Sequence, residues 1–211
     1  MGGRVPDPAL IALLVAGGYL AGSIPFGYWV VRLLKRDDIR RHGSGNIGAT
    51  NVWRAYGWRL GVPVMLLDVL KGLGPALAGA LLVDDLAGVL AGGAAMLGHW
   101  RPLFMGFAKG GKMVATAGGT LFGVAALAGL AAAGVWILLF VLLRYASVSS
   151  MVAAASIPLF AWAFGEPWPV IAFGAIAGAG VALVHRPNIR RLRAGTESRF
   201  QLRRRVTPAS P

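Results

Sequence analysis

The sequence has 211 residues, of which 56% are hydrophobic, and its mean hydropathy is +0.65. This composition excludes an ordinary soluble domain and indicates a membrane protein. The sequence contains no cysteine, which excludes disulfides, a thiolate nucleophile and cysteine metal sites. The net charge of +13 would also suit a nucleic-acid-binding protein, so the positions of the charges must decide between nucleic acid and membrane.

Apolar runs separated by polar segments predict an all-α polytopic membrane protein with about seven transmembrane helices. The first run is longer than a signal-peptide core, so we expect it to be retained as a span. Six spans are the alternative, because Gly129 and Gly134 offer the only break between the fourth and fifth runs. The runs cover residues 8–34, 60–82, 86–98, 114–128, 130–143, 151–164 and 168–184.

Basic residues follow the first, third, fifth and seventh runs, whereas Asp84, Asp85 and Glu166 lie in the alternate loops. By the positive-inside rule, this distribution predicts an N-terminus outside the cell and a C-terminus in the cytoplasm. Topology and anionic lipid then account for most of the charge, so no nucleic-acid partner is expected. We expect residues 1–200 to form a single membrane domain and residues 201–211 to form a flexible basic tail.

A polar, glycine-rich segment, residues 41–56, separates the first two apolar runs. Gly43 and Gly45 allow the backbone to bring its N–H groups close to a ligand. Hydroxyl, amide and guanidinium donors in the same segment favour an anion site, with a solvated turn between two helices as the alternative. These donors include Ser44, Asn46, Asn51 and Arg54.

A second motif, residues 107–116, places Lys109 and Lys112 on either side of Gly110 and Gly111, ahead of the fourth run. A phosphate there would meet backbone donors, a helix N-terminus and a cationic side chain. The spacing is not that of a Walker A loop. Two lysines that snorkel at the membrane interface are the alternative, and the residues alone do not decide between them.

A third motif begins at the end of the last apolar run, where His185 and Asn188 flank Arg186 and Pro187. A histidine at a helix end can act as a general base near neutral pH. We expect Pro187 to disfavour helix at Arg186, which leaves a shared helical face for His185 and Asn188 open. The alternative is an interfacial histidine that only marks the end of a helix, and we interpret His99 in the same way.

Two further polar features lie outside the three motifs. Asp68 and Lys71 are three residues apart in the second run, so they can face each other, and we interpret them as a structural pair. Ser150 ends a hydroxyl-rich turn that covers residues 144–150. Its side chain could donate to a ligand or could cap the sixth span.

Together, these motifs resemble those of the bacterial acyl-phosphate:glycerol-3-phosphate acyltransferases of the PlsY type. The match runs in order over nearly the whole chain, and its most specific parts are GSGNIGATN at residues 43–51 and HRPNIRRLRAGTE at residues 185–197. The motifs GSIPFG, LDVLKG, GHWRPLF, KGGKMVAT and RYASVSS complete it.

The resemblance implies a multi-pass enzyme of the bacterial plasma membrane with active-site loops on the cytoplasmic side. Such an enzyme transfers a fatty acyl group from a long-chain acyl phosphate to the 1-hydroxyl of glycerol 3-phosphate. The products are lysophosphatidic acid and inorganic phosphate, in the first step of phospholipid synthesis. The resemblance implies no cofactor, no metal and no acyl-CoA, and membrane lipid is an expected contact. Whether an acyl-phosphate synthase also docks on the protein is left open by the sequence.

The resemblance also assigns roles to individual residues. Four are expected to be catalytic, namely Ser44, Arg54, His185 and Asn188. Among the residues expected to bind the substrates, the resemblance assigns Gly110, Gly111, Lys112 and Ser150, and the anion-site motifs described above add Gly43, Gly45, Asn46, Asn51 and Lys109. No residue is expected to bind a metal, and Glu197 matches a glutamate that we expect to be structural. The second motif departs from the family at Met113, which replaces a glycine, and at Ala108, which is an extra residue.

The expected mechanism is direct acyl transfer, in which either His185 or the leaving phosphate accepts the hydroxyl proton. An acyl-enzyme on Ser44 is less favoured, since no histidine–carboxylate relay is evident around it. A transporter of a small phosphorylated solute is the alternative from another class of protein. Against it, the two halves show no inverted repeat, and only Asp68 and Lys71 could lie near the membrane midplane. A nonenzymatic lipid-binding protein is a third reading.

Overall fold

The computed structural model describes residues 7–200, and that part of the chain is entirely helical. Its helices are α1 (Pro8–Gly22), α2 (Phe26–Lys35), η1 (Ile39–Arg41), α3 (Ala49–Tyr56), α4 (Trp58–Leu82), α5 (Asp85–Trp100), η2 (Leu103–Met105), α6 (Val114–Val124), α7 (Ala126–Leu143), α8 (Ala146–Ala163), α9 (Trp168–Val184) and α10 (Arg186–Arg193). The predicted basic tail, residues 201–211, lies outside the described residues.

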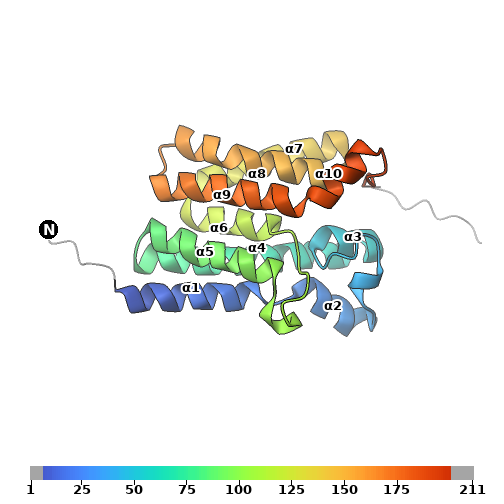
Figure 1. Ribbon diagram of the computed structural model, residues 1–211, viewed down its shortest axis with the longest axis horizontal. Helices are drawn as coiled ribbons and strands as arrows, with labels where there is room; N and C mark the ends of the chain where they lie inside the picture. Colours follow the sequence, from blue (N-terminus) through green and yellow to red (C-terminus); the bar gives the residue numbers. More distant parts are fainter. Residues whose placement is uncertain (1–6, 201–211) are drawn as a thin grey trace, which may run out of the picture.

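The longer helices run back and forth along one axis, and the short helices α2, α3 and α10 gather at one end of the bundle (Figure 1). Four segments are long and apolar enough to cross a membrane, namely Pro8–Lys35, Trp58–Leu82, Ala126–Leu143 and Ala146–Ala163. Helices α9 and α10 make a fifth if this pair, bent by 57°, is counted as one span. The all-α prediction is confirmed, whereas seven spans stay a prediction.

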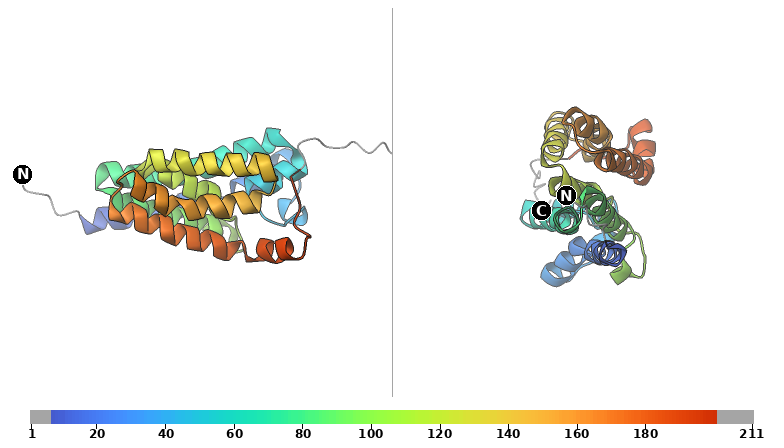
Figure 2. Two further views of the ribbon diagram at one scale, coloured as in Figure 1. Left: turned by 90° about the horizontal axis from the view of Figure 1, so that it is seen from above. Right: turned by 90° about the vertical axis from the view of Figure 1, so that its left-hand side faces the viewer.

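Two groups of helices make up the bundle (Figure 2). Helices α1, α4, α5 and α6 pack against one another, and α7, α8 and α9 form the second group. Contacts of α6 with α7 and of α5 with α9 join the groups, and the largest buried apolar cluster lies between them, with Leu121, Val170 and Val181 among its members.

The break between the fourth and fifth apolar runs is at Ala125, so the prediction of a break at Gly129 or Gly134 was wrong. Ala125 has an extended backbone, with φ −153° and ψ 69°. Gly129 lies inside α7, where it lets the helix pack closely against Phe122 and Leu121 of α6. A glycine in an apolar run can thus mark close helix packing instead of a helix end.

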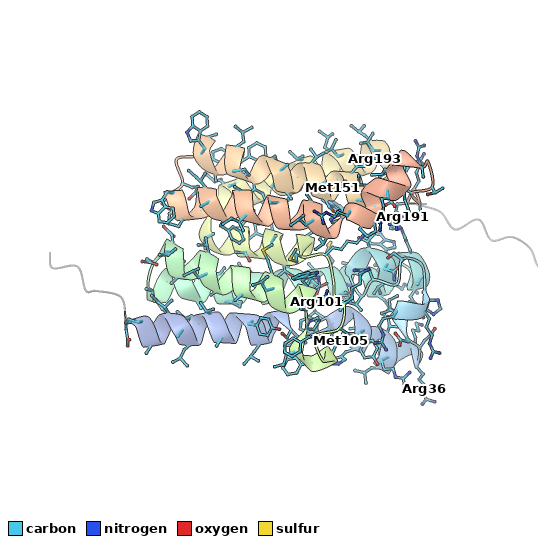
Figure 3. The ribbon with its side chains drawn as sticks, viewed as in Figure 1. Arg36, Arg101, Met105, Met151, Arg191 and Arg193 are labelled. Atoms are coloured by element: carbon cyan, nitrogen blue, oxygen red, sulfur yellow. The ribbon has the colours of Figure 1, made fainter. Side chains whose placement is uncertain are left out.

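Charged residues are distributed unequally between the two ends of the bundle. Arg36, Arg191 and Arg193 lie at the end that carries α2 and α10 (Figure 3). Asp84 precedes α5, and Glu166 lies in the turn between α8 and α9, so both carboxylates lie at the opposite end. This asymmetry is the three-dimensional counterpart of the loop charges from which the sequence predicts orientation.

Close packing of α1 against α5 depends on glycine and gives a test of the fold. A Cβ atom at Gly22 would overlap the backbone carbonyl of Ala95, whereas a Cβ at Gly17 would meet nothing within 4 Å. We expect Gly22→Val to lower the free energy of unfolding by about 1–3 kcal/mol, because the backbones must separate. Thermal unfolding in detergent would measure the effect, with Gly17→Val as the matched control. Equal effects of the two substitutions would contradict this packing.

Candidate active site

A buried carboxylate, Glu197, organises the end of the bundle that carries the motifs. Its Oε1 atom accepts hydrogen bonds from Ser147 Oγ of α8 at 2.7 Å and from Asn188 Nδ2 of α10 at 2.6 Å. Its Oε2 atom accepts from Arg191 Nε at 2.7 Å. Burial raises the pKa of Glu197, but these three hydrogen bonds lower it, and its net pKa is below the ordinary value. The side chain is therefore an ionised acceptor near neutral pH.

The Glu197 hydrogen bonds fix the orientation of Asn188. Because Nδ2 of Asn188 donates to the carboxylate, its Oδ1 faces the other way and accepts from Lys112 Nζ at 2.7 Å. The third motif is thereby joined to the second. Burial is the main reason that the pKa of Lys112 falls to about 8, with the cations Arg191, Arg54 and Lys109 adding to it and Glu197 opposing it.

His185 lies between α9 and α10 and is 2% exposed. Its Nδ1 atom is 2.8 Å from the carbonyl oxygen of Val181. Since a carbonyl can only accept, Nδ1 carries the hydrogen and Nε2 is left as an acceptor. Burial, and then the positive charge of Lys112, lowers the pKa of His185 to about 4, so the ring is neutral near neutral pH.

The helix that follows His185 corrects one prediction. Arg186 is the first residue of α10, and Pro187 lies in the first turn of that helix. The prediction that Pro187 disfavours helix at Arg186 was wrong, since Arg186 is helical, and Pro187 itself lies in a turn whose N–H groups have no internal acceptors, so its missing N–H costs no hydrogen bond. The resulting bend of 57° between α9 and α10 places both His185 and Asn188 in buried positions.

The first motif is a loop that its own asparagines hold together. Asn51 Oδ1 accepts from the backbone N–H of Ser44 at 3.1 Å, and Asn51 Nδ2 donates to the carbonyl oxygen of Asn46 at 2.8 Å. Gly43 and Gly45 have left-handed backbones, with φ of 54° and 68°, which explains the glycines. The Ser44 side chain is exposed, and its hydroxyl donates to no other residue in the described part of the chain.

The first and second motifs touch through Asn46, whose Nδ2 donates to the carbonyl oxygen of Gly110 at 3.0 Å. Its Oδ1 accepts from the N–H of Gly48 at 2.8 Å. The amides of Asn46 and Asn51 are thus engaged with protein backbone. Sequence reasoning placed both residues among the substrate-binding groups, whereas these contacts support a role in positioning the loops.

The second motif rests on α5. The N–H groups of Gly110 and Gly111 donate to the carbonyl oxygens of Trp100 and His99, each at 2.9 Å. A Cβ atom at Gly111 would overlap the His99 ring, so glycine is required for this close approach. His99 lies in the last turn of α5, as predicted for a histidine at a helix end, but it is only 4% exposed and lies beneath the loop instead of at an interface. Lys109, by contrast, is exposed.

Behind the loop, Asp68 and Lys71 of α4 form the predicted pair, with Lys71 Nζ 2.9 Å from Asp68 Oδ1. Lys71 Nζ also donates to the carbonyl oxygen of Ile24 at 3.0 Å, at the break between α1 and α2. His99 Nδ1 lies 3.6 Å from Asp68 Oδ1, too far for a good hydrogen bond. The pair therefore ties α4 to the break between α1 and α2.

Met113 and Ala108, the two departures in the second motif, are accommodated locally. Met113 has φ 68° and so keeps a left-handed conformation that favours glycine, at a cost of about 1–2 kcal/mol. Its side chain is 5% exposed and joins the main apolar cluster, which offsets that strain. Ala108 lies in the turn after η2, where its N–H donates to the Met105 carbonyl oxygen at 3.2 Å.

Ser150 does not lie at the end of a helix. Helix α8 begins at Ala146 with Tyr145 as its N-cap residue, so the capping alternative for Ser150 is wrong. Its Oγ atom accepts from the indole Nε1 of Trp136 at 3.0 Å. Ser147, one turn earlier in the same motif, is the serine that contacts Glu197. Sequence reasoning missed Ser147. Its spacing of three residues from Ser150 places the two serines on the same face of a helix, which was the available signal.

Arg54 lies on α3, which packs against α4 at the same end of the bundle. Its Nη2 atom donates to the carbonyl oxygen of Ser198 at 3.0 Å. Its Nε atom is buried and has no hydrogen-bond partner among residues 7–200. A half-buried guanidinium whose Nε donor is free suits an anion. Within the described residues, histidine and carboxylate side chains form no group of three or more that could hold a metal ion.

Hydrogen bonds thus join Lys112 to Asn188 and Asn188 to Glu197. Arg54 is connected to the same cluster through the backbone carbonyl of Ser198, the residue after Glu197. His185 precedes the helix that carries Asn188. The described contacts do not join the Ser44 hydroxyl or the Lys109 side chain to this cluster. The arrangement offers an ammonium, a guanidinium and the N-terminus of α6 to a phosphate, beside a neutral histidine that can accept a hydrogen bond.

The sequence model of the glycerol-3-phosphate acyltransferase family matches residues 12–195 of the chain. The chain belongs to this family. A glycerol-3-phosphate acyltransferase of Synechococcus sp. (strain JA-3-3Ab) is 45% identical over 195 residues, which cover 92% of this chain and 96% of that protein. One from Hyphomonas neptunium is 45% identical over 206 residues, which cover 97% and 99%.

Two crystal structures of an integral membrane member of the family, PlsY (YgiH), have the same fold. The glycerol 3-phosphate form superimposes with a TM-score of 0.87 at 43% identity and covers 91% of this chain and 96% of that one. The lysophosphatidic acid form gives 0.84 at 42% identity, with the same coverage. Family membership and the apolar helices together confirm the prediction of a multi-pass membrane protein.

Lys112 gives the site a pH dependence that can be tested. Because its pKa is lowered to about 8, its positive charge is present below that pH and is lost as the pH rises through it. We expect the affinity for a small phosphate monoester to fall between about pH 7 and pH 9, where the ligand itself stays a dianion. Titration calorimetry would measure the fall, and Lys112→Arg should remove it, because guanidinium stays protonated. An equal fall in both proteins would contradict the role of Lys112.

Proposed function

We propose that this protein transfers a fatty acyl group from acyl phosphate to the 1-hydroxyl of glycerol 3-phosphate, which gives lysophosphatidic acid and inorganic phosphate. Family membership supports the enzyme class, and the related structures are described as forms with glycerol 3-phosphate and with lysophosphatidic acid. The observation that carries the proposal is the meeting of Lys112, Asn188 and Arg54 at one end of the bundle. The relatives named above are acyltransferases and lend no support to a transporter.

Charge is the main obstacle that this site must overcome. Glycerol 3-phosphate and acyl phosphate are both anions, so they repel each other as they approach. Lys112 and Arg54 would offset that repulsion, and the first N–H groups of α6 would add backbone donors. Since acyl phosphate is already activated, positioning two anions within bonding distance supplies most of the catalysis that the protein must provide.

The proposed chemistry is direct transfer. The glycerol hydroxyl oxygen forms a bond to the acyl carbonyl carbon, and the bond from that carbon to the phosphate oxygen breaks. His185 Nε2 accepts a hydrogen bond from the attacking hydroxyl and orients it. The departing phosphate is a stronger base than His185, whose pKa is lowered to about 4, so the hydroxyl proton ends on phosphate. No histidine or carboxylate donates to or accepts from the Ser44 hydroxyl within residues 7–200, which supports direct transfer over an acyl-enzyme.

We further propose seven membrane crossings, by α1, α4, α5, α6, α7, α8 and α9, in a bacterial plasma membrane and in one domain. The basic end of the bundle would face the cytoplasm, which follows the positive-inside rule and places the N-terminus outside. The shorter helices α5 and α6 would then cross with help from their flanking loops. A soluble acyl-phosphate synthase could deliver its product to this same end.

The test is acyl transfer by protein purified in detergent with a chelator present. It would receive labelled glycerol 3-phosphate with either palmitoyl phosphate or palmitoyl-CoA. We expect product from palmitoyl phosphate alone, and a loss of about 10²-fold or more in His185→Ala, because the hydroxyl is no longer oriented. Arg193→Ala, on the exposed face of α10, is the control. Product from palmitoyl-CoA alone would overturn the donor, and product from neither would overturn the function.

A further inference from the structure

Residues 197–200, which we call the C-terminal strap, run from the end of α10 to a position between α3 and α7. Phe200 ends the strap and is only 3% exposed. Its N–H donates to the carbonyl oxygen of Arg144 at 2.7 Å. Its ring meets Trp53 of α3 edge-on, with centroids 5.4 Å apart, and Phe140 of α7 at 5.1 Å. Phe200, at the end of the strap, thus lies between α3 and α7.

The C-terminal strap makes two contacts with the Arg54 guanidinium. The Ser198 carbonyl oxygen accepts from Arg54 Nη2 at 3.0 Å, and the Arg54 Cζ atom lies 5.8 Å from the centroid of the Phe200 ring. That distance is within the range of a cation–π contact. Arginine has a long side chain with many rotamers, so two such contacts select one orientation of the guanidinium. In that orientation Nε stays buried and unpartnered among the described residues, as a donor for a ligand.

Glu197, the first residue of the strap, is held in place by hydrogen bonds. Its carboxylate is tied to α8 and α10 through Ser147 and Asn188, and the strap runs from there to Phe200. Glu197 thus positions Lys112 through Asn188, whereas Ser198 and Phe200 contact Arg54 directly. The family model ends at residue 195, just before this segment.

We propose that Phe200 is a positioning residue for acyl transfer. Its aromatic ring seats the strap so that the Ser198 carbonyl and the ring itself hold the Arg54 guanidinium in the orientation that binds substrate phosphate. Phe200 acts through Arg54 and does not touch the substrate. This inference rests on the proposed function, in which Arg54 is one of the two cationic side chains that offset the repulsion between the substrates.

A purely structural role would give a different pattern of mutational effects from a role through Arg54. If Phe200 only stabilised the fold, its substitution would lower activity by the same factor whether or not Arg54 were present. If it acts through Arg54, its substitution should matter little once Arg54 has been replaced. A double-mutant cycle separates the two cases, since the residues share one contact network.

The experiment compares wild type, Phe200→Leu, Arg54→Lys and the double variant in detergent. Leucine removes the ring but keeps an apolar side chain of similar reach, and thermal unfolding would confirm that each protein is folded. We expect Phe200→Leu to lower kcat/KM for glycerol 3-phosphate by about 10- to 100-fold alone, but by less than about 2-fold in the Arg54→Lys background. Phe200→Tyr should recover most of the activity, because it retains an aromatic ring.

Two further measurements make the outcome decisive. Phe164→Leu, at an exposed phenylalanine after α8 at the opposite end of the bundle, is the matched control and should retain wild-type activity. For variants whose turnover is too slow to follow, the dissociation constant of glycerol 3-phosphate, measured without acyl donor, is compared across the same four proteins. Equal losses from Phe200→Leu in both backgrounds, with wild type active, would overturn the positioning role alone. Absence of acyl transfer in wild type would overturn the proposed function.

Discussion

The site depends on one constraint, which is that the buried Glu197 carboxylate must be satisfied by hydrogen-bond donors. An unpaired buried charge would cost several kcal/mol, so donors from neighbouring elements converge on it. Ser147 comes from α8, whereas Asn188 and Arg191 come from α10. Because the Asn188 amide has only one orientation that donates to Glu197, its oxygen faces Lys112. One carboxylate therefore sets the geometry of a cationic group two contacts away.

The same region joins the two helix groups. Arg54 lies on α3 in the first third of the chain and Lys112 lies between η2 and α6 in its middle, whereas their partners Ser198 and Asn188 lie near its last described residues. The cationic groups are thus held in place by contacts with the end of the chain, which lies at the same end of the bundle as α3 (Figure 1). A site built in this way links substrate binding to the packing of the whole bundle.

Much of this arrangement could be predicted from the sequence, and the exceptions have physical reasons. Apolar runs identified the helices, and glycines next to cations identified the loops near Arg54 and Lys112. Partner choice could not be predicted, because the bonds of Asn51 to its own loop depend on backbone positions that spacing does not specify. The partners of Glu197 could not be predicted either. The resemblance predicted a structural role for this residue but did not identify the three side chains that donate hydrogen bonds to it. The break at Ala125 was missed because no residue type marks it.

Replacing Glu197 with glutamine tests the central claim most directly, because the side chain keeps its size and loses its charge. Glutamine cannot accept from all three donors, so we expect Asn188 to turn and Lys112 to be released. The account predicts that folded Glu197→Gln protein binds glycerol 3-phosphate at least about 10-fold more weakly than wild type, as loss of a charged hydrogen bond implies. The control is Glu166→Gln, at the opposite end of the bundle. Wild-type affinity in Glu197→Gln would contradict the account.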